Sequence, residues 1–328
     1  MIETAPAPRI AVPVEIDAAA LRGFDPAAPV CTLSGETMGT TWQVQAALPE
    51  RLGLATDDVK TRIQARLNAI VGEMSHWDEA SNLCRFNRAN AGSATQLPTD
   101  FAQVIACALN VARESDGAFD PAQGQLTDLW GLGPNPAPAE PEATAIAEAQ
   151  SVSGWRKLAF DPSTSALHQP GGLWLDLSGI AKGYAVDAVA DLLGTLGISH
   201  ALVEIGGECT GRGMRPDGDP WWVDLESPPG LSLSPLRVAL HQLSVATSGD
   251  YLRGAHTLDP RTGWPAIHGT TAVSVLHRHC MEADAWATAL GVVKLPEAQA
   301  LAIRHDLAAR IVLRSGAEWL SPALRAML

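Results

Sequence analysis

The sequence lacks the cysteine pairs that mark zinc sites and disulfide frameworks. Its five cysteines are widely spaced and contain no CxxC pair; they are Cys31, Cys84, Cys107, Cys209 and Cys280. Neither a zinc site nor a set of structural disulfides is therefore expected.

Long apolar runs, basic runs and glycine fingerprints are also missing. No stretch approaches the length of a membrane span, and no GxGxxG motif is present, which disfavours a Rossmann fold. The formal net charge is −13 and no Lys/Arg-rich run occurs. Because nucleic acids and anionic membranes repel an acidic protein that has no basic patch, neither is expected as a partner.

What is present indicates one compact α+β unit. The chain has 328 residues, of which 46% are hydrophobic and 18% are charged, enough to bury a full core. A mainly helical N-terminal part is predicted. It begins with a strand at 40–47, followed by an amphipathic helix with Val59, Ile63, Leu67 and Ile70 on one side and by a second helix at 100–115. Prolines near 133–141 indicate a linker, and a strand-rich C-terminal part follows, with strands at 201–205, 221–225, 237–240, 272–276 and 310–313.

Residues 173–187 suit an anion. The segment predicts a short apolar strand, a turn that carries Ser178 and Gly179, and a helix that begins with Lys182. Unpaired amides and partial positive charge at a helix start bind phosphate oxygens, and the lysine adds a full charge. An ordinary connection between a strand and a helix explains the same residues.

A candidate metal site lies in the second half. Asp284 and Thr288 are four apart in an alanine-rich helical segment, so they share one face. Hard oxygen donors of this kind suit Mg²⁺ better than zinc. The alternative is that Asp284 only complements the dipole at the start of the helix.

His256 precedes a tight loop. The residues Asp-Pro-Arg-Thr-Gly at 259–263 are typical of turns, so the loop aims the histidine side chain. Histidine is the usual general base near neutral pH, although a lone histidine beside a turn is more often a structural hydrogen-bonding group.

Taken together, these motifs resemble the FAD:protein FMN transferases, the ApbE family. The resemblance rests on eight ordered blocks, at 35–42, 74–77, 81–87, 117–121, 176–187, 203–208, the His256 loop and 284–288. It implies that FAD binds between the two parts of the fold. It also implies that Mg²⁺ assists attack by a Thr or Ser hydroxyl of a target flavoprotein on the FMN-side phosphorus, with AMP as leaving group.

The resemblance implies roles for particular residues. The metal ligands would be Asp284, Thr288 and the backbone carbonyl of Gly179. The FAD contacts would be Met38, Trp77, Ala118, Phe119, Asp120, Asp176, Lys182 and Leu258. His256 is expected to be the general base, with Asp284 or a metal-bound species as the rival.

Three of the FAD contacts have further interpretations. Trp77 is expected beside a flavin or adenine ring, since an indole stacks well on flat rings. Asp120 precedes a proline and has turn initiation as its alternative role. Asp176 interrupts an apolar segment, where a carboxylate is unfavourable unless it meets a donor or a cation.

Two rival functions stay open at this point. A Mg²⁺-dependent FAD pyrophosphatase would use the same residues with water in place of the hydroxyl. A flavin carrier or assembly factor without turnover would not need Asp284, Thr288 and Lys182 together. The acceptor implied by the resemblance is a membrane-associated redox subunit.

The first 30 residues are expected to form a flexible Pro/Ala-rich leader before a transferase domain at 31–328. Cys31 is no lipoprotein site, because the residues before it hold Asp, Glu, Arg and Pro and no apolar run. Many members of the family are exported, so the resemblance favours the periplasm, with an export signal removed from this chain. If no signal was removed, the cytoplasm is the expected location.

Overall fold

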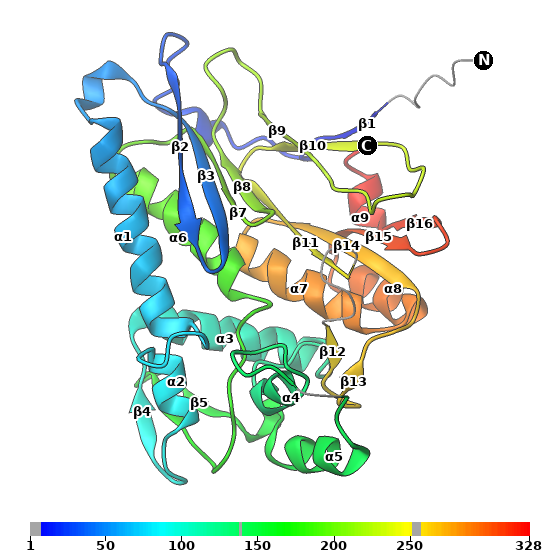
Figure 1. Ribbon diagram of the computed structural model, residues 1–328. Coiled ribbons are helices and arrows are strands. Elements are labelled where there is room, and N and C mark those ends of the chain that lie inside the picture. The colour runs from blue at the N-terminus through cyan, green and yellow to red at the C-terminus, as the bar shows by residue number, and fades with distance from the viewer. Residues whose placement is uncertain (1–7, 138–139, 251–256) are drawn as a thin grey trace.

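The centre of the molecule is an eight-stranded sheet (Figure 1). The computed structural model describes residues 8–137, 140–250 and 257–328. The strand order is β16-β15-β14-β11-β8-β7-β3-β2, and each neighbouring pair is antiparallel. The strands are β2 (Val30–Thr37), β3 (Thr40–Ala47), β7 (Ala201–Ile205), β8 (Glu208–Arg212), β11 (Leu243–Gly249), β14 (Thr270–His277), β15 (Ala308–Leu313) and β16 (Glu318–Leu320).

Three long helices cover one face of this sheet. They are α1 (Thr56–Met74), α6 (Ala181–Thr195) and α7 (Cys280–Val292). Helix α1 buries the predicted apolar stripe and leaves its polar side exposed. Helices α6 and α7 are apolar almost all round, because they pack against each other and lie between the sheet and neighbouring helices. The predicted α+β class is confirmed.

The helical part lies below the sheet in Figure 1. It contains α2 (Asn82–Asn87), α3 (Thr99–Glu114), α4 (Gly124–Leu129), α5 (Ala143–Val152) and a small sheet of order β4-β6-β5. The strands of this sheet are β4 (Ala94–Gln96), β5 (Ala159–Asp161) and β6 (Ala166–His168). The predicted helix at 100–115 corresponds to α3. Elsewhere the described chain contains two further helices, α8 (Leu295–Arg304) and α9 (Pro322–Arg325). It also contains a two-stranded sheet formed by β12 (Leu258–Asp259) and β13 (Trp264–Pro265).

A second sheet packs on the other face of the central one. Its order is β1-β10-β9, formed by β1 (Arg9–Ala11), β9 (Trp221–Asp224) and β10 (Leu236–Leu240). Strand β1 runs parallel to β10 and buries Ala11 in a small core shared with Trp221 and Leu324. Part of the expected flexible leader at residues 1–30 is therefore paired and packed. A strand of three residues gives too short a pattern to be recognised from sequence.

The predicted strand at 173–177 is wrong. These residues form neither a helix nor a strand. Side chains accept the backbone hydrogen bonds that a neighbouring strand would otherwise accept. The Asn87 side chain accepts the Leu175 amide at 2.8 Å, and the Gln169 side chain accepts the Leu173 amide at 3.2 Å. The Asp176 amide donates to the carbonyl of Pro121 at 2.9 Å. The following turn and the helix after it are as predicted. Among the described residues, no helix has both the length and the apolar character needed to cross a membrane.

Candidate active site

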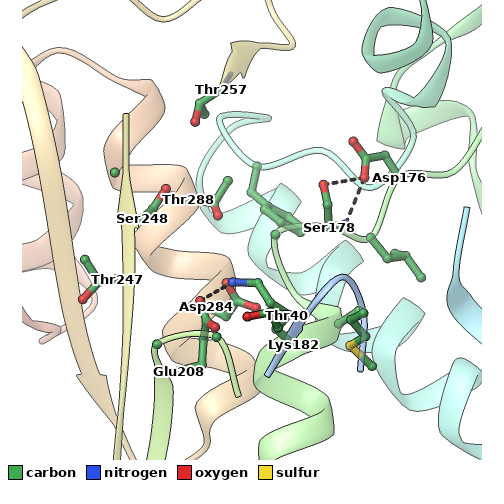
Figure 2. Close-up of a pocket in the computed structure, with 18 of the residues that line it drawn as sticks. Thr40, Asp176, Ser178, Lys182, Glu208, Thr247, Ser248, Thr257, Asp284 and Thr288 are labelled. Atoms are coloured by element: carbon green, nitrogen blue, oxygen red, sulfur yellow. Dashed lines mark hydrogen bonds and ion pairs between the residues drawn. The ribbon is translucent and has the colours of Figure 1, made fainter. Parts of the chain in front are cut away.

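A cleft with a volume of about 650 Å³ opens where the helical part meets the central sheet. Its walls come from the β2–β3 turn, the end of α1, α4, the turn before α6, the β7–β8 turn, the ends of β9 and β11, and α7. Segments that are far apart in sequence thus converge on one space. Figure 2 shows the polar side chains that converge there.

Lys182, Glu208 and Asp284 form the charged centre of the cleft. The Lys182 ammonium donates to Glu208 Oε1 at 2.6 Å. Asp284 Oδ2 accepts the backbone N–H of Gly183 at 3.0 Å. Glu208 is 2% exposed and Asp284 is 6% exposed. Figure 2 shows the Lys182 and Glu208 side chains directed toward each other, with Asp284 beside them.

Burial controls the ionisation of both carboxyl groups. It raises the pKa of Glu208 to about 8, and although Lys182 opposes this shift, the charge of Asp284 adds to it. Burial also raises the pKa of Asp284, against the opposing effects of Lys182 and the Gly183 amide. Within the described chain, Glu208 Oε2 has no hydrogen-bond partner. Two buried acidic groups beside one lysine make a centre that a further cation would stabilise.

The expected metal donors lie together. Thr288 follows Asp284 by one helical turn on α7, and both line the cleft. Gly179 packs directly on Thr288, since a Cβ added to Gly179 would lie 2.8 Å from Thr288 Oγ1. Among the residues that the structure describes, no group of three or more His, Cys, Asp and Glu side chains could hold a metal. A metal here would therefore use carboxylate, hydroxyl and carbonyl oxygens, a donor set that fits Mg²⁺.

The start of α6 differs from the row of bare amides that was expected. The Ala181 amide donates to Leu177, the Tyr184 amide donates to Ile180, and Asp284 accepts the Gly183 amide. The preceding turn folds back, and α7 supplies a carboxylate, so these donors are satisfied within the protein. The side chain of Lys182, rather than a set of free amides, is the group at this helix start that suits an anion.

Asp176 organises the turn before α6. Its carboxylate accepts the Ser178 amide at 2.9 Å, the Ser178 hydroxyl at 2.6 Å and the Thr127 hydroxyl at 2.6 Å. His76 Nδ1 lies 3.7 Å from the same carboxylate. The prediction that this buried acid meets donors is confirmed, and its contacts fix the backbone that leads to Gly179.

Asp120 initiates a turn and also lines the cleft. Its two carboxylate oxygens accept the amides of Ala122 at 2.8 Å and Trp155 at 3.0 Å. Burial raises the pKa of Asp120 to about 6, although these two hydrogen bonds act in the opposite direction. Asp120 therefore both initiates the turn and lines the cleft.

The structure brings most of the remaining expected contacts to the same space. Met38, Trp77, Phe119 and Leu258 line the cleft, and Trp77 is 65% exposed at its edge. Ala118 does not line it and is 1% exposed within the core. His256 lies outside the described residues.

Sequence reasoning gave no role to several polar residues of the cleft. Glu208 and Thr40 stand in motif blocks but received no role, Thr247 and Ser248 stand in no block, and all four line the cleft. The local sequence offers for Glu208 only its position directly after Gly206 and Gly207. The fold supplies the rest, because Glu208 begins β8 and the next three residues are buried, a position where a carboxylate needs a partner.

The fold and the cleft define an α+β protein with one buried cluster of charged side chains, Lys182, Glu208 and Asp284, in the cleft between its sheet and its helical part. A model of the ApbE family matches residues 38–311. The FAD:protein FMN transferase of Haemophilus influenzae is 33% identical over 304 residues, which cover 87% of each chain. That of Escherichia coli K12 is 31% identical over 315 residues, which cover 91% of this chain and 89% of the relative.

Solved structures agree with this match. The apo flavinyl transferase ApbE of Pseudomonas stutzeri superposes with a TM-score of 0.85 at 34% identity, covering 92% of this chain and 97% of the other. The flavin transferase ApbE of Vibrio cholerae has a TM-score of 0.86 at 31% identity, covering 92% and 100% of the two chains. The chain therefore belongs to the ApbE family of enzymes.

Proposed function

We propose that this protein transfers FMN from FAD to a Thr or Ser hydroxyl of a target flavoprotein and releases AMP. One observation carries the proposal: Lys182, Asp284, Thr288 and Gly179, from two helices and a turn, converge in one cleft. The relatives named FAD:protein FMN transferase support the same reaction.

The reaction is a phosphoryl transfer within the diphosphate of FAD. The target hydroxyl oxygen forms a bond with the phosphorus of the FMN half. The bond from that phosphorus to the bridging oxygen breaks, and AMP leaves with this oxygen. The hydroxyl proton passes to a base. Such a reaction needs charge neutralisation and in-line positioning more than covalent chemistry from the protein.

Mg²⁺ suits the oxygen donors at this site and would be held by Asp284, Thr288 and the Gly179 carbonyl. When bound, it would neutralise diphosphate charge and orient the phosphoryl oxygens. Glu208, whose Oε2 has no hydrogen-bond partner within the described chain, has a pKa that burial raises to about 8; a cation bound nearby would favour its ionised form and so add negative charge near these ligands. Asp176 accepts two hydrogen bonds from Ser178, so it would help to position the carbonyl of the next residue, Gly179.

Lys182 would bind a diphosphate oxygen from the start of α6. Its present partner, Glu208, keeps the ammonium at the centre of the cleft until an anion arrives. We propose His256 as the base that accepts the hydroxyl proton, with Asp284 as the rival. Leu258, two residues after His256 in the sequence, lines the cleft, as does Thr257.

The expected FAD contacts would hold the rest of the cofactor. Trp77, exposed at the cleft edge, offers an indole face for a flavin or adenine ring. Met38, Phe119, Asp120, Asp176 and Leu258 would line the remaining length, while Ala118 would act only by supporting Phe119 from the core. By resemblance, we place the acceptor among membrane-associated redox subunits and the reaction in the periplasm.

The test is to follow FAD and AMP by chromatography, with and without an acceptor domain and with and without a chelator. The proposal predicts AMP release that requires both the acceptor and the metal. AMP and free FMN at the same rate without the acceptor would indicate a pyrophosphatase. FAD that binds but stays intact under all conditions would indicate a carrier.

A further inference from the structure

One wall of the cleft is formed by the end of a strand on the second sheet. Residues 223–226, at the end of β9 and just beyond it, line the cleft on the sheet side. The loop after them runs to β10, which begins at Leu236. The loop therefore leaves the cleft wall and returns beside the first strand of the chain, β1.

Two arginines hold the two ends of this loop. Arg310, on β15, donates to the carbonyl of Glu226 at 3.0 Å and to the Ser227 hydroxyl at 3.2 Å. Arg9, on β1, donates to the carbonyl of Ser234 at 2.9 Å through its side chain. Its backbone amide also donates to the carbonyl of Pro235 at 2.9 Å. The beginning and the end of the loop are each fixed by one guanidinium group.

Glu318 joins the two arginines. It accepts from Arg310 Nε at 2.6 Å and from Arg9 Nη2 at 2.9 Å, both at Oε1. The side chain of Arg310 is 1% exposed, that of Glu318 is 15% exposed and that of Arg9 is 27% exposed. Burial alone would raise the pKa of Glu318, but its hydrogen bonds to Arg9 and Arg310 lower it overall. The carboxylate is thus ionised and shared by both guanidinium groups at neutral pH.

These hydrogen bonds affect the cleft through the position of its wall at 223–226 rather than through charge. A guanidinium group has a rigid fork of donors, so Arg310 fixes the Glu226 carbonyl relative to β15 and Glu318. Because Arg310 is buried, it depends on Glu318 for neutralisation. Arg9 in turn limits the movement of Glu318 and of the far end of the loop. A change at Arg9 would therefore reach the cleft wall through Glu318 and Arg310, without Arg9 touching the cleft.

We propose that Arg9, Glu318 and Arg310 form a positioning triad that holds the wall at 223–226 in the conformation that binds FAD. In this arrangement the first strand of the described chain is part of the machinery that sets FAD affinity. The statement about FAD rests on the proposed function. The statement about the wall rests on the hydrogen bonds alone.

The test uses Arg9→Gln, because Arg9 is the least buried member and its replacement leaves Arg310 paired with Glu318. Arg51→Gln is the matched control. Arg51 also ties the N-terminal segment to the body, through Asp25 and the Gly23 carbonyl, but it does not line the cleft. Arg9→Lys keeps the charge and loses the fork, so it should fall between Arg9→Gln and the wild type.

The first measurement is hydrogen exchange of residues 221–227 in the protein without FAD. Arg9→Gln should lower the protection of this segment, and Arg51→Gln should not. The second measurement is FAD binding by flavin fluorescence. Loss of one partly exposed ion pair predicts an increase in the FAD dissociation constant of about fivefold in Arg9→Gln only. In turnover, KM for FAD should rise while kcat stays near the wild-type value.

The outcomes separate the two proposals. Unchanged protection at 221–227, or an equal loss of FAD affinity in both glutamine variants, would overturn the triad. A fall in kcat with unchanged KM would do the same, because a positioned binding wall acts on affinity. If the wild type bound no FAD, the proposed function would fail, and the exchange measurement would still decide whether the triad holds the wall.

Discussion

Lys182 Nζ lies 2.6 Å from Glu208 Oε1, so the lysine at the start of α6 is held by a carboxylate from β8. Asp284, on α7, lies close enough to both groups to affect the pKa of Glu208 and to be affected by Lys182. Two acids and one base therefore share a buried centre. On the proposed function, this charge balance would require a cation to bind together with the anionic diphosphate.

Lys182→Met should weaken FAD more than riboflavin, because the proposed partner of the ammonium is phosphate. A hydrogen bond to a charged group contributes roughly 1.5–3 kcal/mol, which corresponds to an increase in the FAD dissociation constant of about 10- to 100-fold. Titrations of both ligands by fluorescence measure the difference. An equal weakening of FAD and riboflavin would contradict the phosphate role.

The lysine variant needs a control for folding, because it leaves Glu208 buried without its cation. The double variant Lys182→Met with Glu208→Gln removes both charges. It should regain thermal stability relative to the single variant while FAD binding stays weak. If the double variant bound FAD normally, the ammonium would have no part in binding.

Glu208→Gln should raise the Mg²⁺ concentration needed for half-maximal transfer by roughly tenfold, a typical effect for a group just outside the metal ligands. The physical reason is that a cation near Asp284 favours the ionised form of Glu208, whereas glutamine cannot supply this negative charge. Glu204→Gln is the matched control, since Glu204 accepts the Gly207 amide in the same turn, at 2.7 Å, and is not among the described residues that line the cleft. A Mg²⁺ titration in which the two variants behave alike would assign Glu208 to folding alone.

Gly183→Ala tests the close approach of α6 and α7. A Cβ at Gly183 would lie 2.3 Å from the Cys280 carbonyl oxygen and 2.8 Å from Asp284 Cβ, so the helices must separate. Overpacking of this kind should lower the free energy of unfolding by about 3 kcal/mol. Urea unfolding measures this change in stability. Activity should also fall, because the added methyl group displaces Asp284.

Gly194→Ala, on the same helix, is the control. An added Cβ at Gly194 meets nothing within 4 Å. The higher helix propensity of alanine should therefore raise the stability by about 0.5–1 kcal/mol. If both alanine variants changed the stability equally, the contact between α6 and α7 would not be the cause.

Asp120 should make the protein less stable as the pH rises from about 4 to 6. Its pKa is raised to about 6 in the folded protein, above the ordinary value of 3.8, so the folded state binds the proton more tightly than the unfolded state. The resulting stability is fully present below pH 4 and is lost as the pH passes 6, a change of roughly 2–3 kcal/mol.

Urea unfolding between pH 4 and 6 checks this contribution. Asp120→Asn should flatten the pH dependence relative to the wild type, whereas Asp116→Asn, at an exposed position on the same turn region, should leave it unchanged. A wild-type slope that survives in Asp120→Asn would place the titrating group elsewhere.

Local patterns in the sequence were enough for much of the fold. The strand at 40–47 and the stripe Val59, Ile63, Leu67 and Ile70 follow from periodicity, because one side of each element faces the core. The segment at 173–177 is as apolar as a strand, but Asn87 and Gln169 satisfy its backbone, and these contacts are not visible in a local pattern.

The site likewise contains pairs of residues that follow from sequence spacing and pairs that only the packed fold brings together. Asp284 and Thr288 share a helix face, so their juxtaposition follows from spacing. The partnership of Lys182 with Glu208 joins residues 26 apart in sequence across the α6–β8 contact, and only the packed fold reveals it. Likewise, the bond from Asp284 to the Gly183 amide replaces the free helix-start donors that local reasoning expects.

The most direct test of the proposed reaction is the intact mass of an acceptor domain after incubation with this protein, FAD and Mg²⁺. Asp284→Asn and a chelator serve as the two negative controls, and Asp191→Asn, on the exposed side of α6, serves as the matched variant. The proposed transfer should give an added mass equal to one esterified FMN with the wild type and Asp191→Asn, and none with Asp284→Asn or chelator. An adduct that forms equally well with Asp284→Asn would remove Asp284, and the metal it is proposed to hold, from the reaction.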